Sequence, residues 1–196
     1  MSQQQAISLQ SFLQQVYPSS DATAKEIASH FEAVHIGKGS FFLREGQRSQ
    51  EYLFLEQGIM RAYLFDTGGN EVTTAFYTSG NIVMEPASLF LHTPSQENIV
   101  AVSDCTALKL TFTKLNELFH TIPAFRETGR AMLVKSLVTL KMRTLSMINQ
   151  TAEERYTALL SASPDIFHHI PLKQIASYLG ITDTSLSRIR KEMARR

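Results

Sequence analysis

The residues best suited to recognise another molecule lie close together near the C-terminus, in segment 182–191. Hydroxyl groups, one carboxylate and two of the segment's three cations recur there at helical spacing: Thr182, Asp183, Thr184, Ser185, Ser187, Arg188 and Lys191. Hydroxyls and carboxylates exchange hydrogen bonds with the edges of nucleobases, and an arginine can donate two parallel hydrogen bonds to guanine. Cations towards the end of such a helix suit backbone phosphates. The segment therefore predicts a surface for double-stranded DNA.

The apolar residues around this segment predict two helices joined by a short turn at Gly180. They recur at helical spacing as Leu172, Ile175, Ala176 and Leu179 before the glycine, and as Leu186, Ile189 and Met193 after it. The glycine ends the first helix, and Thr182 is placed to cap the second. Two helices joined by about four residues that include Gly are typical of a helix-turn-helix unit. The alternative is a helical hairpin that serves only packing.

Charge is distributed unevenly along the chain. Residues 170–196 carry six Lys or Arg and two acids, a net +4, whereas the whole chain of 196 residues carries +1. This asymmetry favours an anionic partner for the C-terminal part. The alternative is a solvated cationic helix end stabilised by the helix dipole.

The middle of the chain has a sequence pattern typical of antiparallel strands. From Val34 to about Leu110, short runs rich in Val, Phe, Tyr and Thr are broken by glycines, and 59–77 is the clearest hairpin, with a Gly-Gly turn. About seven strands that each bury one face predict a compact β-roll or barrel. Before the roll, 5–16 and 22–33 predict two short amphipathic helices, with Asp21 as the N-cap of the second.

The segment after the roll predicts a short helix at 112–120 and a long one at 124–149. The long helix has two apolar stripes, one of Leu133, Leu137, Leu140 and Met147 and the other of Val134, Val138, Leu145 and Ile148. We expect one stripe to pack on the chain's own β-region and the other on a second copy of the chain. The alternative is a helix buried twice within one chain. A further helix at 151–164 opens with a capping-box pattern, Thr151 and Glu154.

Several classes of protein are disfavoured. Cys105 is the only cysteine, which excludes an internal disulfide framework and an iron–sulfur cluster held by four cysteines. The N-terminus lacks a signal-peptide pattern, and no run approaches the ~20 apolar residues that span a bilayer, so we expect a cytoplasmic protein without a membrane partner. The six histidines form no His-x-His pair, and no nucleophile motif or phosphate-cradling loop occurs. The sequence predicts neither a metal site nor an enzyme.

The chain resembles the Crp/Fnr family of transcriptional regulators, in its short Bacteroidetes-type form. The phrases that carry the resemblance are 37-GKGSFFLREGQ-47, 52-YLFLEQGIMRAYLFDTGGNE-71, 151-TAEERYTALL-160 and 174-QIASYLGITDTSLSRIRKE-192. It implies an α+β chain with three parts: a double-stranded β-helix (jelly-roll) domain of cyclic-nucleotide-binding type at 1–122, a dimerisation helix at 123–149 and a helix-turn-helix domain at 150–196. It also implies a homodimer on a two-fold DNA site, with RNA polymerase as a further partner.

The resemblance places the family's base-reading positions on Asp183, Thr184, Ser187 and Arg188. Asp183-Thr184 stands where many members have Arg-Glu, so the family's usual operator cannot be assumed. The family's β-hairpin wing before the motif has no counterpart in 165–170.

The phosphate cassette of nucleotide-binding members is degenerate in this chain. Glu85 matches the family's glutamate, but Met84 replaces the glycine before it, and Ser95-Gln96 stand where the family has Arg followed by Ser or Thr. No Lys or Arg occurs between Arg61 and Lys109. Burying a phosphate without a cation is costly. We therefore expect no useful binding of cyclic AMP, and an effector that is another small molecule or none; Glu85 is then a turn residue.

Together these patterns predict a homodimeric, DNA-binding transcription regulator. The alternative function is a ligand-binding β-roll whose terminal helices mediate protein contacts.

Overall fold

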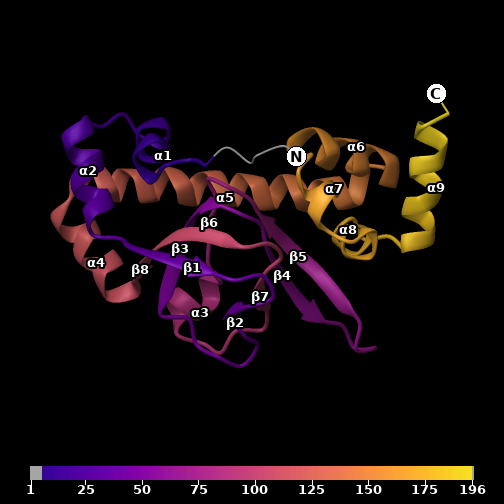
Figure 1. Cartoon of the computed structure of the whole chain (residues 1–196), viewed down its shortest axis with the longest axis horizontal. Helices are drawn as coiled ribbons and strands as arrows, with labels where there is room; N and C mark the ends of the chain where they lie inside the picture. Colours follow the sequence, from indigo (N-terminus) through magenta and orange to yellow (C-terminus); the bar gives the residue numbers. More distant parts are fainter. Residues whose placement is uncertain (1–5, 196) are drawn as a thin grey trace.

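The computed structural model describes residues 6–195 of the chain, which form nine helices and eight strands (Figure 1). The helices are α1 (Leu9–Val16), α2 (Asp21–Ser29), α3 (Pro86–Leu91), α4 (Phe112–Thr121), α5 (Pro123–Asn149), α6 (Ala152–Ala162), α7 (Ile166–His169), α8 (Leu172–Tyr178) and α9 (Asp183–Met193). The strands are β1 (Glu32–Ile36), β2 (Phe41–Leu43), β3 (Glu51–Gln57), β4 (Met60–Phe65), β5 (Glu71–Tyr77), β6 (Ile82–Val83), β7 (Asn98–Ala101) and β8 (Cys105–Thr111).

The strands form two antiparallel four-stranded sheets, ordered β1-β8-β3-β6 and β2-β7-β4-β5. A shared core lies between the sheets, where Leu53 and Leu55 of one meet Met60, Ala62 and Ile99 of the other. Strands β3 and β4 each bury four consecutive residues, because both of their faces are covered. The α+β fold with an N-terminal jelly roll is confirmed, although the roll has one strand more than the pattern of glycines predicts.

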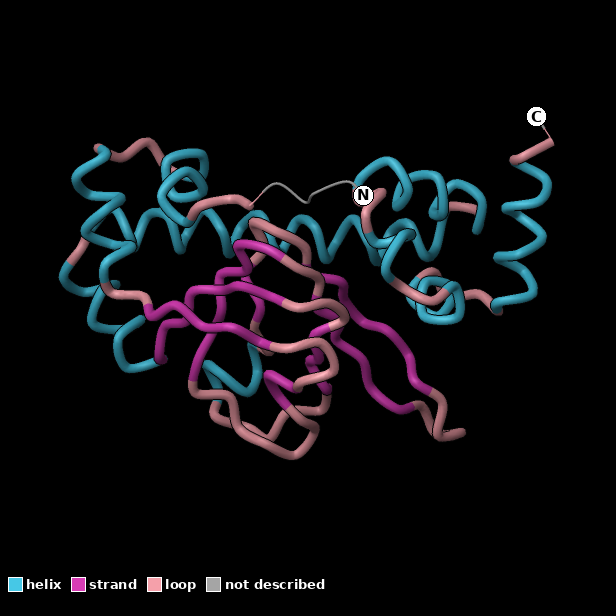
Figure 2. Tube along the Cα trace, in the orientation of Figure 1, coloured by secondary structure: helices cyan, strands magenta, loops and turns pink. Residues whose placement is uncertain are grey.

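The predicted Gly-Gly hairpin is the β4–β5 pair, which extends beyond the body of the roll (Figure 2). Its turn is held by Asp66 Oδ1, which accepts hydrogen bonds from the backbone N–H groups of Gly68 and Asn70 at 2.8 Å each. The pairing register shifts beside Thr74, so β5 carries an extra residue there. Such a bulge bends the strand and leaves backbone groups for other partners.

The N-terminal helices are shorter than the sequence predicts. Ser20, rather than Asp21, caps α2, because its hydroxyl accepts the Thr23 N–H at 3.1 Å. The second helix does not reach residue 33: it ends at Ser29, and the chain turns into strand β1 from Glu32. The apolar residues that suggested a longer helix belong to two elements. Ile27 is a buried residue of α2, whereas Val34 lies in β1.

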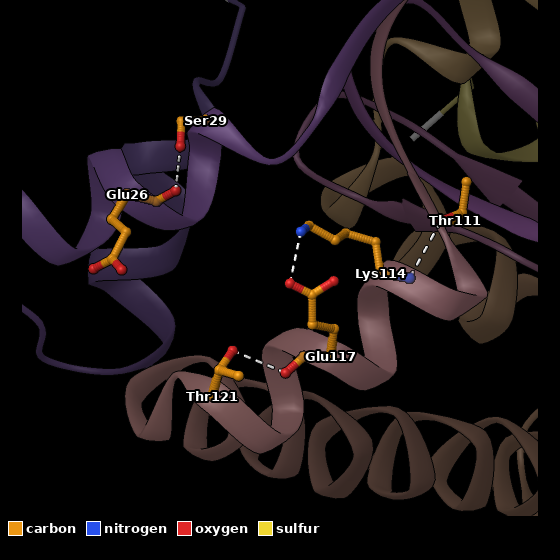
Figure 3. Close-up of polar contacts among 6 residues, drawn as sticks. All are labelled: Glu26, Ser29, Thr111, Lys114, Glu117 and Thr121. Carbon is orange, nitrogen blue, oxygen red and sulfur yellow. Dashed lines mark hydrogen bonds and ion pairs between the residues drawn. The ribbon is translucent and has the colours of Figure 1, made fainter.

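Helix α4 closes one end of the roll and leads directly into α5 (Figure 3). Thr111 caps it by accepting the Lys114 N–H at 3.3 Å, and Lys114 pairs with Glu117 one turn later at 2.8 Å. Thr121 Oγ1 donates to the Glu117 carbonyl at 2.9 Å near the helix end. On the other side of the same view, Ser29 bonds back to Glu26 within α2.

The long helix α5 places both of its apolar stripes in contact with solvent. Every residue of the two predicted stripes is exposed, with Leu137 at 67% and Ile148 at 76%. The prediction that one stripe packs on the chain's own β-region is therefore wrong, and so is the alternative of a helix buried twice. Beyond Met132, the residues of α5 that meet their own chain include Lys135 beside α1, Arg143 reaching β5 and Met147 beside Gly180.

Helices α6 to α9 form a helical unit that meets the second sheet through α8 and strand β5. Their core, built around Tyr156, Ile166 and Ile175, includes Ile59 of the roll and is covered by Phe76 of β5. Helix α8 lies along β5, which is the edge strand of its sheet. Within residues 6–195, strands occur only between Glu32 and Thr111, so the segment before α8 contains the short helix α7 where a hairpin wing would lie.

Candidate nucleic-acid interface

The turn between α8 and α9 depends on Gly180. Its φ is +69°, a conformation that side-chain-bearing residues rarely adopt, and it ends α8 with the Ile181 N–H donating to the Ala176 carbonyl at 3.0 Å. A Cβ built on Gly180 would lie 2.5 Å from Met147 Cε of α5. The glycine is therefore required both for the turn and for the close approach of the long helix. Met147, predicted as part of the dimer stripe, also packs within its own chain.

Helix α9 starts and is anchored as its sequence predicts. Thr182 is the N-cap, with its hydroxyl accepting the Ser185 N–H at 3.2 Å. Leu186 and Ile189 are buried against α8, where Ala176 is also buried. Apolar positions on one side of the helix thus fix the direction in which the opposite side points.

The opposite side of α9 is polar and exposed. Five of the residues predicted to bind DNA share this exposed face: Asp183, Thr184, Ser187, Arg188 and Lys191. The other two, Thr182 and Ser185, hydrogen-bond to each other through their hydroxyls at 3.0 Å and serve the cap. Within residues 6–195 neither Arg188 nor Lys191 has an ion-pair partner. Asp183 is partly engaged, because its Oδ1 accepts the Thr184 N–H at 3.0 Å.

Helix α9 stands at one end of the molecule, away from the roll (Figure 1). Only its inner side is covered, by α8 and by Tyr156 and Phe167 of the helices before it. The exposed face is therefore accessible to a partner as large as a DNA duplex, whose major groove is about 12 Å wide.

A three-way contact fixes this helical unit against the roll. The Thr73 N–H of β5 donates to Ser177 Oγ of α8 at 2.7 Å. Next to it, Arg143 of α5 donates to the carbonyl of Thr74 and, at 3.4 Å, to that of Tyr178, whose ring lies 4.1 Å from the guanidinium. The bulge in β5 thus presents free backbone groups that two helices use.

Neither this contact nor the buried arginine Arg61 on the same hairpin was predicted from the sequence. Arg61 is 2% exposed and donates to Thr73 Oγ1 at 2.9 Å and to Glu71 at 2.6 Å. The only signal was weak: Arg61 is a lone cation in an apolar strand run, and Arg143 lies between the two apolar stripes.

The cassette residues of the roll lie close in the chain, and two of the three use their side chains to bond the backbone. Glu85 is the N-cap of α3, and its two carboxylate oxygens accept the N–H groups of Ala87 (3.1 Å) and Ser88 (2.5 Å). Ser95 is buried and its hydroxyl bonds to the backbone of Glu97 at both N–H and C=O. Gln96 is exposed. The placement of Glu85 is that of a turn residue.

Acidic side chains dominate the electrostatics of the cassette. Burial raises the pKa of Glu97, the charge of Glu85 adds to the rise, and the charge of Arg143 works against it. Burial likewise raises the pKa of Tyr77, again with contributions from Glu97 and Glu85. On the long helix, Arg126 and Arg130 are exposed, and Arg130 pairs with Glu127 at 2.8 Å. Glu85 and Glu97 thus interact with each other electrostatically within the cassette.

The part of the chain that the structure describes, residues 6–195, contains no group of three or more His, Cys, Asp or Glu side chains placed to hold a metal ion. None of its helices combines the length and the apolar character that crossing a membrane requires.

Comparison with known proteins places these features in a known fold. Residues 33–121 match the family model of the cyclic nucleotide-binding domain. In sequence, the chain is 22% identical over 166 residues to electron transport regulator A of Shewanella oneidensis, which covers 79% of this chain and 65% of that protein. The chain thus spans less than two thirds of the length of this curated relative.

Solved structures with similar folds cover nearly the whole chain. The c-di-GMP-responsive global regulator CLP of Xanthomonas campestris has a TM-score of 0.70 at 15% identity, covering 90% of this chain and 92% of its own. FixK2 of Bradyrhizobium japonicum has a TM-score of 0.70 at 16% identity, with coverages of 84% and 85%. The catabolite activator protein of Thermus thermophilus has a TM-score of 0.58 at 20% identity, with coverages of 94% and 87%. The fold that the family resemblance implies is confirmed.

Proposed function

We propose that this chain, which contains a cyclic nucleotide-binding domain and has the fold of the Crp/Fnr regulators, is a homodimeric DNA-binding transcription regulator that does not respond to cyclic AMP. The exposed polar face of α9, opposite its buried apolar side, carries this proposal. On it, Thr184, Ser187 and Arg188 are free to contact base edges, and Lys191 to contact a phosphate. The relatives with this fold are regulators, which favours a non-enzymatic role in the cytoplasm, with RNA polymerase as a partner.

In this proposal each of the three parts of the chain has its own function. Residues 1–122 form the effector domain, 123–149 the dimer helix and 150–196 the DNA-binding domain. The exposed stripe of Leu133, Leu137 and Leu140 is the surface for the second copy, because an apolar helix face left in water would favour association.

Absence of a response to cyclic AMP is supported by what the cassette side chains already do. Glu85 has both carboxylate oxygens bonded to its own helix, and the raised pKa of Glu97 reflects a buried, acid-rich surrounding. Isothermal titration of the purified dimer with cyclic AMP tests this part. A micromolar dissociation constant would refute it.

DNA binding is tested by selecting bound duplexes from a random pool with the purified full chain. We expect a two-fold symmetric motif, and an affinity that falls steeply with salt because cationic side chains release counterions. Sedimentation of the same sample should give a dimer. Recovery of no preferred motif, together with salt-independent behaviour, would instead favour the ligand-binding roll whose helices contact proteins.

A further inference from the structure

A hollow lies between the N-terminal helix and the long helix, outside the cassette. Its volume is about 470 Å³, within the range of small-molecule sites. Its walls come from α1 and the residue shortly before it, from the turn between β5 and β6, and from α5. The apolar wall is formed by Ile7, Phe12 and Val16, and the polar groups come from Gln15, Ser79 and Lys135.

Gly80 lets the N-terminal segment approach the roll closely enough to form this hollow. Its φ is +84°, and its N–H donates to the Leu55 carbonyl at 2.7 Å. A Cβ built on it would lie 2.9 Å from Ile7 Cδ1. The Ile7 N–H in turn donates to the Glu56 carbonyl at 3.2 Å, which ties the segment to β3. The hollow is thus walled by elements that are bonded together.

The polar groups of this hollow are unused, in contrast to those of the cassette. The hydroxyl oxygen of Ser79 is buried and has no hydrogen-bond partner within residues 6–195. Lys135 has no ion-pair partner in the same part of the chain, and none of the residues lining the hollow is an acid. An unsatisfied buried polar group costs free energy, so a bound polar atom that pairs with it is favoured.

We propose that this hollow binds a small amphipathic carboxylic acid. The carboxylate would pair with the Lys135 ammonium and accept the Ser79 hydroxyl proton in a hydrogen bond, because charge-assisted bonds of this kind are the strong ones. The hydrocarbon body would lie against Ile7, Phe12 and Val16, where burial of apolar area adds affinity. A single cation suits a single negative charge better than a doubly charged phosphate.

The hollow shares two elements with the contact that holds α8. Ser79 lies two residues after the end of β5, whose Thr73 and Thr74 bond to Ser177 and Arg143. Lys135 and Arg143 lie eight residues apart on α5, about two turns. A ligand that moves either element would change how the DNA-binding unit is held, and DNA would then change ligand affinity by the same factor. This regulatory consequence rests on the proposed function, whereas ligand binding itself does not.

Titration calorimetry of the full chain with decanoate tests the site, with 1-decanol as the uncharged probe. We expect one saturable decanoate per chain and weaker binding of decanol. Lys135→Met should weaken decanoate binding about tenfold and Ser79→Ala several-fold, in line with the loss of charge-assisted and neutral hydrogen bonds. Lys38→Met is the matched control, because Lys38 is exposed and does not line the hollow, and it should leave affinity unchanged.

The exposed stripes of α5 could also attract an alkyl chain, so the location must be tested with the wild-type chain. With methyl-labelled protein, decanoate should shift the nuclear magnetic resonance signals of Ile7 and leave those of Leu137 unchanged. The proposal is overturned if Leu137 shifts and Ile7 does not, if no saturable binding is found, or if Lys135→Met behaves like Lys38→Met. A site that binds decanoate in a chain that selects no DNA motif would sustain the site and refute the proposed function alone.

Discussion

Two helix starts in this molecule carry similar polar side chains and use them in opposite ways. At α3, Glu85 gives both carboxylate oxygens to the backbone of its own helix. At α9, Thr182 and Ser185 satisfy the cap between them, and Thr184, Ser187 and Arg188 remain exposed. The difference shows that residue type alone does not make a binding site. A side chain is available to a ligand only where neighbouring residues have already satisfied the backbone.

The comparison makes a general prediction for substitutions. Changing a side chain whose groups are used within the fold should lower stability and leave DNA affinity per folded molecule nearly intact. Changing an unused side chain on α9 should do the reverse. Four substitutions test this, from the largest expected effect to the smallest.

Arg143→Met should have the largest effect, on stability. It removes hydrogen bonds to two carbonyls and the contact with the Tyr178 ring, and a charged hydrogen bond contributes about 1.5–3 kcal/mol. We expect a loss of about 2–3 kcal/mol in chemical unfolding, with earlier proteolysis in the 150–196 region. Arg130→Met is the control, since Arg130 is exposed and pairs only within its own helix. Equal losses for the two variants would contradict the role given to Arg143.

Arg188→Ala should have the next largest effect, on DNA binding. Loss of a two-pronged contact to a base costs about 1–3 kcal/mol of discrimination, or roughly ten- to a hundredfold in specific affinity. The melting temperature should not change, because Arg188 is exposed and unpaired in the described chain. Arg48→Ala, an exposed change on the roll, is the control. If specific and non-specific binding fall equally in a shift assay, Arg188 contacts phosphate rather than a base.

Glu85→Ala should cost about 1 kcal/mol of stability, the usual contribution of an N-cap. Glu85→Asp is the matched variant, because aspartate is a favoured N-cap, and most of the loss should be recovered. Both can be compared by thermal unfolding. The cap role would be wrong if Glu85→Ala unfolds like the wild type while changing the response to cyclic AMP.

Glu97→Gln should have the smallest effect, a slight gain in stability that depends on pH. Burial raises the pKa of Glu97 in the folded chain, so the folded state binds more protons than the unfolded state in the window above the unfolded pKa of about 4.3. Stability therefore falls as pH rises through that window, and glutamine removes the loss. The variant should unfold at a higher temperature than the wild type at pH 7, and the gap should close near pH 4. A gap that widens on acidification would reverse the sign and contradict the burial argument.

The helix-turn-helix geometry could be predicted from the sequence because its determinants are local. The left-handed Gly180, the Thr182 cap and the buried Leu186 all lie within seven residues. Each of these residues determines the conformation or the buried side of its own turn. Together they are compatible with one arrangement of α8 and α9. The capping box at Thr151 and the hairpin turn at Gly69 were predictable for the same reason.

The contact between Arg143 and Thr74 could not be predicted, because it joins residues 69 apart in the chain. It depends on a register shift in β5 that no residue type announces. The two stripes of α5 were misassigned for a related reason. Apolar spacing shows that a helix has an apolar face, but not which neighbour will cover it. The C-terminal end of α2 was predicted wrongly because the apolar residues of the helix and of the strand that follows continue the same spacing.

The position of α8 along β5 has a consequence for the solubility of the protein. An uncovered edge strand presents a row of free N–H and C=O groups on which another chain can add a strand. Here Ser177 and Arg143 occupy two of those groups. Any movement that takes the C-terminal helices away from the roll therefore exposes the edge of β5 to pairing with another chain. The same few residues thus hold the helices in place and protect the protein from self-assembly.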